Sequence, residues 1–308
     1  MTDFDIGAHT IFLALHGSKA YGTDLPESDT DYKGVAVPPE RYFLGFARGF
    51  EQAEKSEPDT VVYDVRKFFK LAADCNPNII EVLFVGDRAV VSSTPEGDML
   101  RGSASLFLSR KARHTFSGYA HSQLKRIRTH RRWLLDPPKA PPSRSEYGLP
   151  EGRKALNHTA MGAFDEMIAA GHRFTGSLME TLRAEKAYAQ ALREWQQYER
   201  WKRSRNPARA ELEARHGYDT KHAMHLVRLL RMCEEILSGK GVIVRRPDRE
   251  ELLAVRAGAW TFEDLMEWAE AQDARCKELY DTSPLPHSPD REALDALCME
   301  VVRRRLRA

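Results

Sequence analysis

Cysteine is scarce in this chain of 308 residues, which has four, at positions 75, 233, 276 and 298, and no CxxC pair. This wide spacing argues against a disulfide framework and against a zinc site. Long apolar runs are also missing, since no stretch reaches the roughly eighteen apolar residues that a membrane-spanning helix needs. The opening residues, MTDFDIGAH, lack a basic segment followed by an apolar one, so no secretory signal is predicted. We therefore expect a soluble cytoplasmic protein with no membrane partner.

An excess of charge of either sign is missing too. The chain has 47 Lys and Arg against 45 Asp and Glu, a formal net charge of +2. A chain that is not basic overall binds nucleic acid only where its basic residues gather locally. Its length allows one large or two medium domains with an ample core, and the sequence shows no internal repeat.

The densest group of functional residues lies in residues 16–37, HGSKAYGTDLPESDTDYKGVAV. A short apolar run leads into Gly17 and Ser18, and a turn-rich stretch then leads to Asp29 and Asp31. Because side chains alternate between the faces of a strand, two aspartates one residue apart at a strand start share one face. Gly17 has no Cβ, so the backbone N–H groups of this turn can approach a phosphate chain closely.

Two neighbouring carboxylates repel each other unless a cation lies between them, and Mg²⁺ prefers a few carboxylates together with substrate phosphates. The pattern therefore favours a nucleotide site that holds Mg²⁺ or Mn²⁺. An EF-hand calcium loop from Asp29 to Glu40 is a competing interpretation, but Lys33 replaces a ligand and Pro38 and Pro39 fall inside the loop. An ordinary surface turn is another interpretation, since Asp, Ser and Pro are common turn residues.

The order Gly-Ser, ten residues, then Asp-x-Asp resembles the nucleotidyltransferases of the DNA polymerase β superfamily. The wider phrase GSKAYG…SDTDYKGVAV is similar to one branch of it, the predicted nucleotidyltransferases linked to RNA repair. Residues 61–84 (VVYDVRKFFKLAADCNPNIIEVLF) and 217–258 (beginning GYDTKHAMHLVRLLRM) resemble the same branch. The superfamily usually has a helix before the first strand, and few residues precede Ile11, so we expect that helix to be short or absent.

The resemblance implies an α+β fold: a polymerase-β-like core, with a small mixed sheet and flanking helices, and an α-helical C-terminal domain. Short strands are predicted at residues 11–16, 31–37 and 60–65. From about residue 103 the pattern is helical almost to the end, so we expect a catalytic domain at 1–102 and a helical domain at 103–308. The proline-rich stretch 136–150 has no periodicity and is predicted to be a loop in the helical part.

The chemistry that the resemblance implies is nucleotidyl transfer, in which an acceptor hydroxyl attacks the α-phosphate of an NTP and pyrophosphate leaves. Two metals roughly 4 Å apart serve this reaction, and they need a third carboxylate beside Asp29 and Asp31. The candidates, Asp59 and Asp64, lie at the two ends of the strand around Val61 to Tyr63. Their positions differ by an odd number, so only one faces the metals. Resemblance to the superfamily favours Asp59 as catalytic and metal-binding, while Asp64 also fits a helix N-cap.

A triphosphate needs cations in addition to metals. On a helical wheel, Lys221, His225 and Arg228 share one face of the helix predicted from residue 217, and apolar residues share the opposite face. We predict that these three residues contact phosphate or acceptor, with Lys221 nearest to the triphosphate. His222, on the apolar face, is predicted to be a core histidine.

Three other residues of the resembling segments are candidates. Arg66 and Lys67 directly follow the strand that carries Asp59, so they are possible triphosphate contacts. Glu81 matches a carboxylate of the segment NPNIIE, and two roles stay open for it: a structural pairing with a nearby cation, or a part in the site itself.

Basic residues gather at 125–132 (KRIRTHRR), 202–209 and 303–307, and Trp133 and Trp201 lie near the first two clusters. Such clusters suit a phosphate backbone with rings available for stacking, although charge runs are also ordinary solvated helix faces. The last cluster suits the C-terminal end of a helix. The predicted nucleic-acid contacts are Lys125, Arg126, Arg128, Arg131 and Arg132.

The resemblance and these residues together predict a metal-dependent nucleotidyltransferase that transfers NMP from an NTP to an acceptor hydroxyl. The resemblance and the basic clusters make an RNA end the first choice of acceptor. Nucleotidylation of a protein or a small molecule is the alternative reaction. A nucleotide-binding or nucleic-acid-binding protein that has lost catalysis is the alternative of another class.

Overall fold

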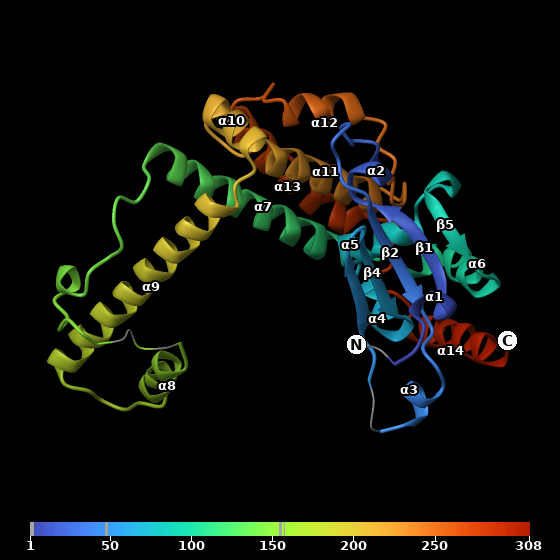
Figure 1. Cartoon of the computed structure of the whole chain (residues 1–308), viewed down its shortest axis with the longest axis horizontal. Coiled ribbons are helices and arrows are strands. Elements are labelled where there is room, and N and C mark those ends of the chain that lie inside the picture. The colour runs from blue at the N-terminus through green and yellow to red at the C-terminus, as the bar shows by residue number, and fades with distance from the viewer. Residues whose placement is uncertain (1–2, 47–48, 154–155, 157) are drawn as a thin grey trace. The chain divides into compact units, whose positions relative to one another are not determined.

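A computed structural model of the chain describes residues 3–46, 49–153, 156 and 158–308 (Figure 1). The chain divides into two compact units, the first formed by residues 1–127 and 219–308 and the second by residues 128–218. Helix α7 (Ala112–Leu135) runs from the first unit into the second. The units therefore differ from the division expected at residue 102, because the chain returns after residue 218 to pack with its N-terminal part.

Within the described residues, five strands form one sheet in the order β3–β4–β2–β1–β5 (Figure 1). The strands are β1 (Thr10–His16), β2 (Asp31–Ala36), β3 (Gln52–Ser56), β4 (Asp59–Asp64) and β5 (Val90–Ser93). β2 and β4 run parallel, and the other neighbouring strands run antiparallel. A small mixed sheet with flanking helices confirms the predicted α+β class.

The central strands supply the apolar core of the sheet, with Ile11 and Phe12 of β1 and Val35 and Ala36 of β2 fully buried. The edge strands β3 (QAEKS) and β5 (VVSS) are short and largely exposed; β3 is mostly polar and β5 ends in two serines. Exposed edge strands of this kind are common, because polar residues at an edge discourage pairing with another chain. Their weak apolar pattern explains why the sequence did not predict them.

The helices of the first unit cover the sheet and extend from it. They are α1 (Ile6–His9), α2 (Gly17–Tyr21), α3 (Arg41–Leu44), α4 (Val65–Ala73), α5 (Pro77–Leu83), α6 (Pro95–Gly102), α11 (Thr220–Leu237), α12 (Arg249–Arg256), α13 (Phe262–Thr282) and α14 (Arg291–Arg307), with the 3₁₀ turns η1 (Asp87–Ala89) and η2 (Ala104–Phe107). The helix before the first strand, α1, has only four residues, as the sequence predicted. α14 packs against α4 and α6, and α11 packs against α12 and α13.

Local sequence fixes where the helices around the site begin. Asp64 caps α4 by accepting hydrogen bonds from the two backbone N–H groups of residues 66 and 67, at 2.8 and 3.3 Å. Asn76 caps α5, whose first residue is Pro77, a residue suited to that position because it needs no N–H partner. Asp219 caps α11 in the same way, by accepting from the N–H of His222.

The second unit is helical in its described residues. It contains the end of α7, the 3₁₀ turn η3 (Ser145–Tyr147), α8 (His158–Ala169), α9 (Gly176–Ser204) and α10 (Pro207–His216). Trp133 of α7 packs against Tyr198 and Trp201 of α9, with ring centroids 5.7 and 5.3 Å apart. The proline-rich stretch 136–150 connects α7 to α8 with η3 as its regular element, in keeping with the predicted loop. No helix of either unit, within the described ranges, has both the length and the apolarity that crossing a bilayer requires.

Candidate metal and nucleotide site

Three predicted carboxylates come together at one end of the sheet. Asp31 is the first residue of β2 and Asp59 the first of β4. β2 and β4 are parallel with Tyr32 opposite Thr60, so Asp31 and Asp59 are neighbours across the sheet and point to the same face. Asp29 lies in the segment just before β2, so the strand begins after it rather than at it.

The electrostatics of Asp31 show how close these carboxylates are. Burial raises the pKa of Asp31, and the charges of Asp59 and Asp29 raise it further. The ammonium groups of Lys221 and Lys33 lower the same pKa, but the net shift is upward. Three carboxylates that repel one another with incomplete compensation form the kind of oxygen-donor set that Mg²⁺ and Mn²⁺ bind.

The geometry separates the two candidates for the third carboxylate. Asp64 is the last residue of β4, at the opposite end of the strand from Asp59. It is buried, caps α4 and forms an ion pair with Arg66 at 3.1 Å. All of its contacts are thus accounted for by local structure, whereas Asp59 faces Asp31.

The Gly17 turn lies directly against Asp31. Gly17 begins α2 with φ of +65°, a left-handed conformation that favours glycine. A Cβ built on Gly17 would lie 2.2 Å from Oδ2 of Asp31, closer than atoms can approach. The predicted phosphate turn, Gly17 and Ser18, is therefore adjacent to the carboxylates.

Two residues that the sequence analysis did not select also belong to this end of the sheet. His16, the last residue of β1, is directly opposite Asp31, and burial, Lys33 and Arg228 lower its pKa, so the imidazole is neutral. Lys33 lies two residues after Asp31 on the same face of β2 and donates to the carbonyl oxygen of Asn78 at 2.9 Å. Burial lowers the pKa of Lys33 to about 8. The alternation rule that selected the aspartates applies equally to Lys33.

The N-terminal part of α11 supplies the cation nearest to the carboxylates. Lys221 lies close enough to Asp31 for its charge to lower the pKa of that carboxyl group. His225, one turn further along, is half-buried, and burial and the charge of Arg228 lower its pKa well below the usual value. At neutral pH the imidazole of His225 is therefore uncharged.

Arg228 is engaged in a buried network. Its guanidinium donates to Oε1 of Glu81 at 2.6 Å and lies over the ring of Tyr21, 3.8 Å from its centroid. The Tyr21 hydroxyl donates to the other oxygen of Glu81 at 2.5 Å. Of the two roles left open for Glu81, the structure supports the ion pair. Arg228 shares the helix face of Lys221 and His225, but it is buried and paired with Glu81. The predicted phosphate contact therefore does not fit Arg228.

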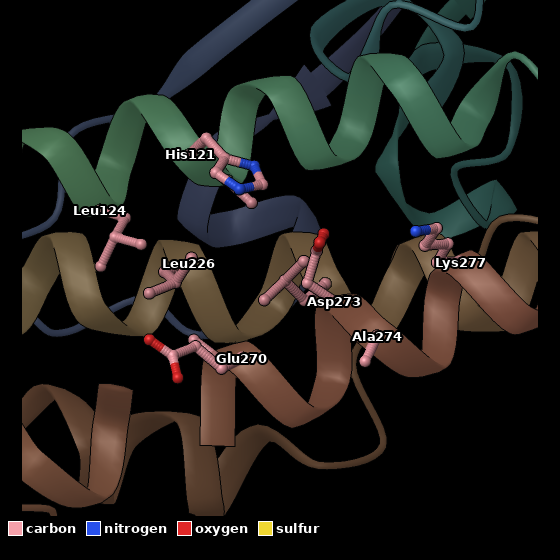
Figure 2. A pocket seen from close by; sticks show the side chains of 10 residues that line it. His121, Leu124, Leu226, Glu270, Asp273, Ala274 and Lys277 are labelled. Carbon is pink, nitrogen blue, oxygen red and sulfur yellow. The ribbon is translucent and has the colours of Figure 1, made fainter. Parts of the chain in front are cut away.

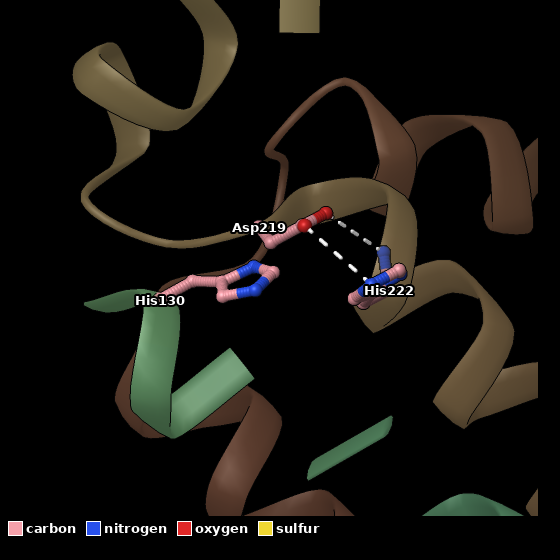
Figure 3. Close-up of side chains that lie close together, drawn as sticks. All are labelled: His130, Asp219 and His222. Carbon is pink, nitrogen blue, oxygen red and sulfur yellow. Dashed lines mark hydrogen bonds and ion pairs between the residues drawn. The ribbon is translucent and has the colours of Figure 1, made fainter. Parts of the chain in front are cut away.

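The surroundings of His222 are not wholly apolar, because its ring lies near a carboxylate. Figure 3 shows its ring beside the carboxylate of Asp219, with Nε2 3.8 Å from Oδ2. The same carboxylate accepts the backbone N–H of His222 at 3.0 Å. His222 thus lies next to the cap that begins α11. It is half-buried and contacts a carboxylate, so it differs from the core histidine that the helical wheel predicts.

Lys67 is not brought to this site. It lies in the first turn of α4, beyond the far end of β4, and pairs with Glu51 at 2.8 Å. It lies eight positions after Asp59, and most of that stretch is the extended strand, so the two residues are on the order of 20 Å apart. Arg66, its neighbour, is paired with Asp64. Both residues directly follow β4, but they lie at its far end, away from Asp31 and Asp59.

The predicted nucleic-acid contacts all lie on α7. Lys125, Arg126, Arg128 and Arg132 are exposed, and Arg132 pairs with Glu194 at 3.1 Å. Arg131 is half-buried and donates to the carbonyl oxygen of Gly217 at 3.1 Å, so part of its bonding capacity is used within the second unit. The first two residues belong to the first unit and the other three to the second.

A separate pocket of about 290 Å³ lies among α7, α11 and α13. Figure 2 shows His121 extending from α7 and Glu270, Asp273 and Lys277 from α13. Its remaining lining is leucine and alanine, and Asp273 is already paired with Arg113 at 3.0 Å. No residue predicted for metal or nucleotide binding lines this pocket, and its largely apolar walls do not suit a triphosphate.

Comparisons with known proteins found a matching family model and a relative. Residues 4–135 match the family described as the RNA repair pathway DNA polymerase beta family, which confirms the resemblance drawn from the sequence. The chain is also 34% identical over 94 residues to an uncharacterised 38.9 kDa protein of Enterobacteria phage T4, encoded in the nrdC–mobD intergenic region. That similarity covers 27% of this chain and 28% of the phage protein. No solved structure matches the chain.

Proposed function

We propose, on the premise that residues 4–135 form a polymerase-β-like module of the RNA-repair family, that this chain transfers NMP from an NTP to a hydroxyl at an RNA end. The observation that carries the proposal is the contact between the Gly17 turn and Asp31. A turn able to bind phosphate and a carboxylate able to bind metal are useful together only if one ligand spans both, and a metal-bound NTP does so.

The three carboxylates are the proposed metal ligands. Asp29, Asp31 and Asp59 would hold one or two divalent ions, which when bound activate the acceptor hydroxyl and neutralise charge on the leaving pyrophosphate. The charges of Asp59 and Asp29 that raise the pKa of Asp31 support this role, because a cation would relieve the repulsion among them.

The chain's own groups orient the triphosphate. The backbone N–H groups of Gly17 and Ser18 would donate to phosphate oxygens, and Lys221 would add a charge-assisted contact. Lys33, held beside Asp31 by its bond to the carbonyl of Asn78, places a second ammonium at the same end of the sheet. The acceptor hydroxyl then attacks the α-phosphorus, and pyrophosphate leaves from the opposite side.

The experiment uses each NTP labelled at either the α or the γ phosphate, with Mg²⁺ or Mn²⁺ and a mixture of RNA, DNA and protein acceptors. We expect α label on RNA and γ label only in released pyrophosphate. Asp31→Ala should lower the rate by at least roughly 10³-fold, the scale seen when charge stabilisation of a transition state is lost. Label on protein instead of RNA would favour the alternative acceptor. No transfer from any NTP would contradict the proposal.

A further inference from the structure

The two units carry charge of opposite sign. Residues 128–218 contain 17 Lys and Arg against 11 Asp and Glu, a net charge of +6. The rest of the chain, which holds the carboxylate site, contains 30 against 34, a net charge of −4. The overall charge of +2 conceals this difference, which points to an anionic partner for the second unit.

One face of α9 concentrates that charge. At 100° per residue, positions 193, 197, 200 and 204 fall within about 60° of one another, and positions 196 and 203 adjoin them. All six side chains are exposed: Arg193, Gln196, Gln197, Arg200, Arg203 and Ser204. We call these six residues the α9 arginine face. It contains no acidic and no apolar residue.

The arginines of this face are open to a ligand. Arg193 and Arg200 form no hydrogen bond or ion pair with any residue that the structure describes. Arg203 uses only Nε, which donates to the carbonyl oxygen of Glu199 in the same helix at 3.2 Å. The neighbouring acid Glu194 is paired with Arg132. Among the described residues, therefore, no ion pair neutralises the positive charge of this face.

The rings beside the face are not available for base stacking. Trp133 and Tyr198 are only 6% and 7% exposed, and they pack against each other. Trp201 packs on both, with centroids 5.3 and 5.9 Å away, and Arg205 covers it at 4.4 Å. The stacking role expected for Trp133 and Trp201 therefore does not fit, because these rings form the core that joins α7 to α9.

We propose that the α9 arginine face binds the phosphate backbone of an RNA acceptor without reading its bases. The choice of RNA rests on the proposed function, and the choice of backbone contact rests on the residues, since the face offers cations and amides but no ring. A membrane-surface helix would need apolar residues on or beside such a face, and this face has none. Arg193 and Arg203 begin about 15 Å apart along the helix, a span that reaches several successive phosphates.

The test measures binding of a labelled RNA hairpin with a single-stranded end by fluorescence anisotropy, without NTP or metal, across a salt series. The variant is R193Q/R200Q in the full chain. Losing two phosphate contacts should weaken binding roughly tenfold at moderate salt and reduce the slope of log K against log salt by about 1.4 to 1.8. Hairpins of different sequence should be affected alike, because backbone contacts carry no base information.

The control is R173Q/R183Q, which removes the same charge from exposed arginines of the same unit outside the α9 arginine face. Its binding should stay within about twofold of wild type. Four results would each overturn the inference. Two concern the variants: equal losses of binding in the two double variants, or an unchanged salt slope in R193Q/R200Q. Two concern the wild type: tighter binding of polyglutamate than of RNA, or no RNA binding. The Asp31→Ala variant should bind RNA normally, so a failure of nucleotidyl transfer and a failure of this surface are read in separate assays.

Discussion

Gly17→Ala tests the contact between the Gly17 turn and the Asp31 carboxylate. The new Cβ would lie 2.2 Å from Oδ2 and 3.3 Å from Cγ of Asp31, so one of the two groups must move. The alanine must also keep φ near +65°. Asp31 is the more movable partner, and its carboxylate would be pushed out of the position that it shares with Asp59.

Two costs can be separated. A left-handed conformation costs an alanine roughly 1–2 kcal/mol, which corresponds to a lowering of Tm by about 2–8 °C in a protein of this size. Gly22→Ala is the matched control, because Gly22 has φ of +74° and follows the same short helix. Its Cβ would meet the guanidinium of Arg245 at 2.7 Å, the mobile end of an exposed side chain. Both variants should lose similar backbone stability, and only Gly17→Ala should displace a carboxylate.

The assay compares the two variants by thermal unfolding, by Mn²⁺ binding and by NMP transfer. We expect similar Tm losses, near-normal Mn²⁺ binding and transfer for Gly22→Ala, and a loss of at least roughly 10²-fold in transfer for Gly17→Ala, since a misplacement of about 1 Å at a reacting centre has that effect. If Gly17→Ala keeps Mn²⁺ binding and transfer equal to those of Gly22→Ala, the turn and the carboxylate do not act together.

Three further substitutions test other parts of the account. Burial and like charges raise the pKa of Asp31, so the ionised carboxylate destabilises the folded state. In EDTA, the wild type should therefore lose stability as the pH rises through that raised pKa. Asp31→Asn should remove this loss in a series of Tm values measured against pH. Glu81→Gln leaves the buried Arg228 without its counter-charge and should cost about 3–5 kcal/mol in urea unfolding, whereas E81Q/R228M should cost less; equal costs would argue against the pairing. Lys221→Ala should weaken NTP binding by about 10- to 150-fold in calorimetry, the value of one charge-assisted contact, and leave Mn²⁺ binding in the absence of nucleotide largely unchanged; an unaltered NTP affinity would remove Lys221 from the site.

Short-range rules predicted the parts of the site that depend on neighbouring residues. The alternation of a strand placed Asp31 at the start of β2, and the same parity argument separated Asp59 from Asp64 once the strand was known. Asp64 has the capping contacts that its position before a helix indicates. Lys33 follows the same alternation, so its place beside Asp31 could also be predicted from the sequence.

Longer-range features could not be predicted in this way. A helical wheel shows that Lys221, His225 and Arg228 share a face, but not how deeply each lies, and Arg228 is buried because Glu81 and Tyr21 approach it from distant parts of the chain. Lys67 lies in the first turn of α4, next to the Asp64 end of β4, whereas the proposed metal site is at the Asp59 end. The return of α11 to α14 to the first unit is likewise a matter of tertiary packing, which no local pattern in the sequence encodes.

The central claim is that the carboxylates at the starts of β2 and β4 hold the metal on which transfer depends. The most direct test measures Mn²⁺ binding by Asp31→Asn, Asp59→Asn and Asp64→Asn. Electron paramagnetic resonance of the free ion detects how much Mn²⁺ remains unbound. Asp64→Asn is the matched control, because asparagine is as good an N-cap as aspartate and should preserve α4. The account predicts that the first two variants lose Mn²⁺ binding and the third retains it. Normal binding by Asp31→Asn and Asp59→Asn, or its loss in Asp64→Asn alone, would contradict it.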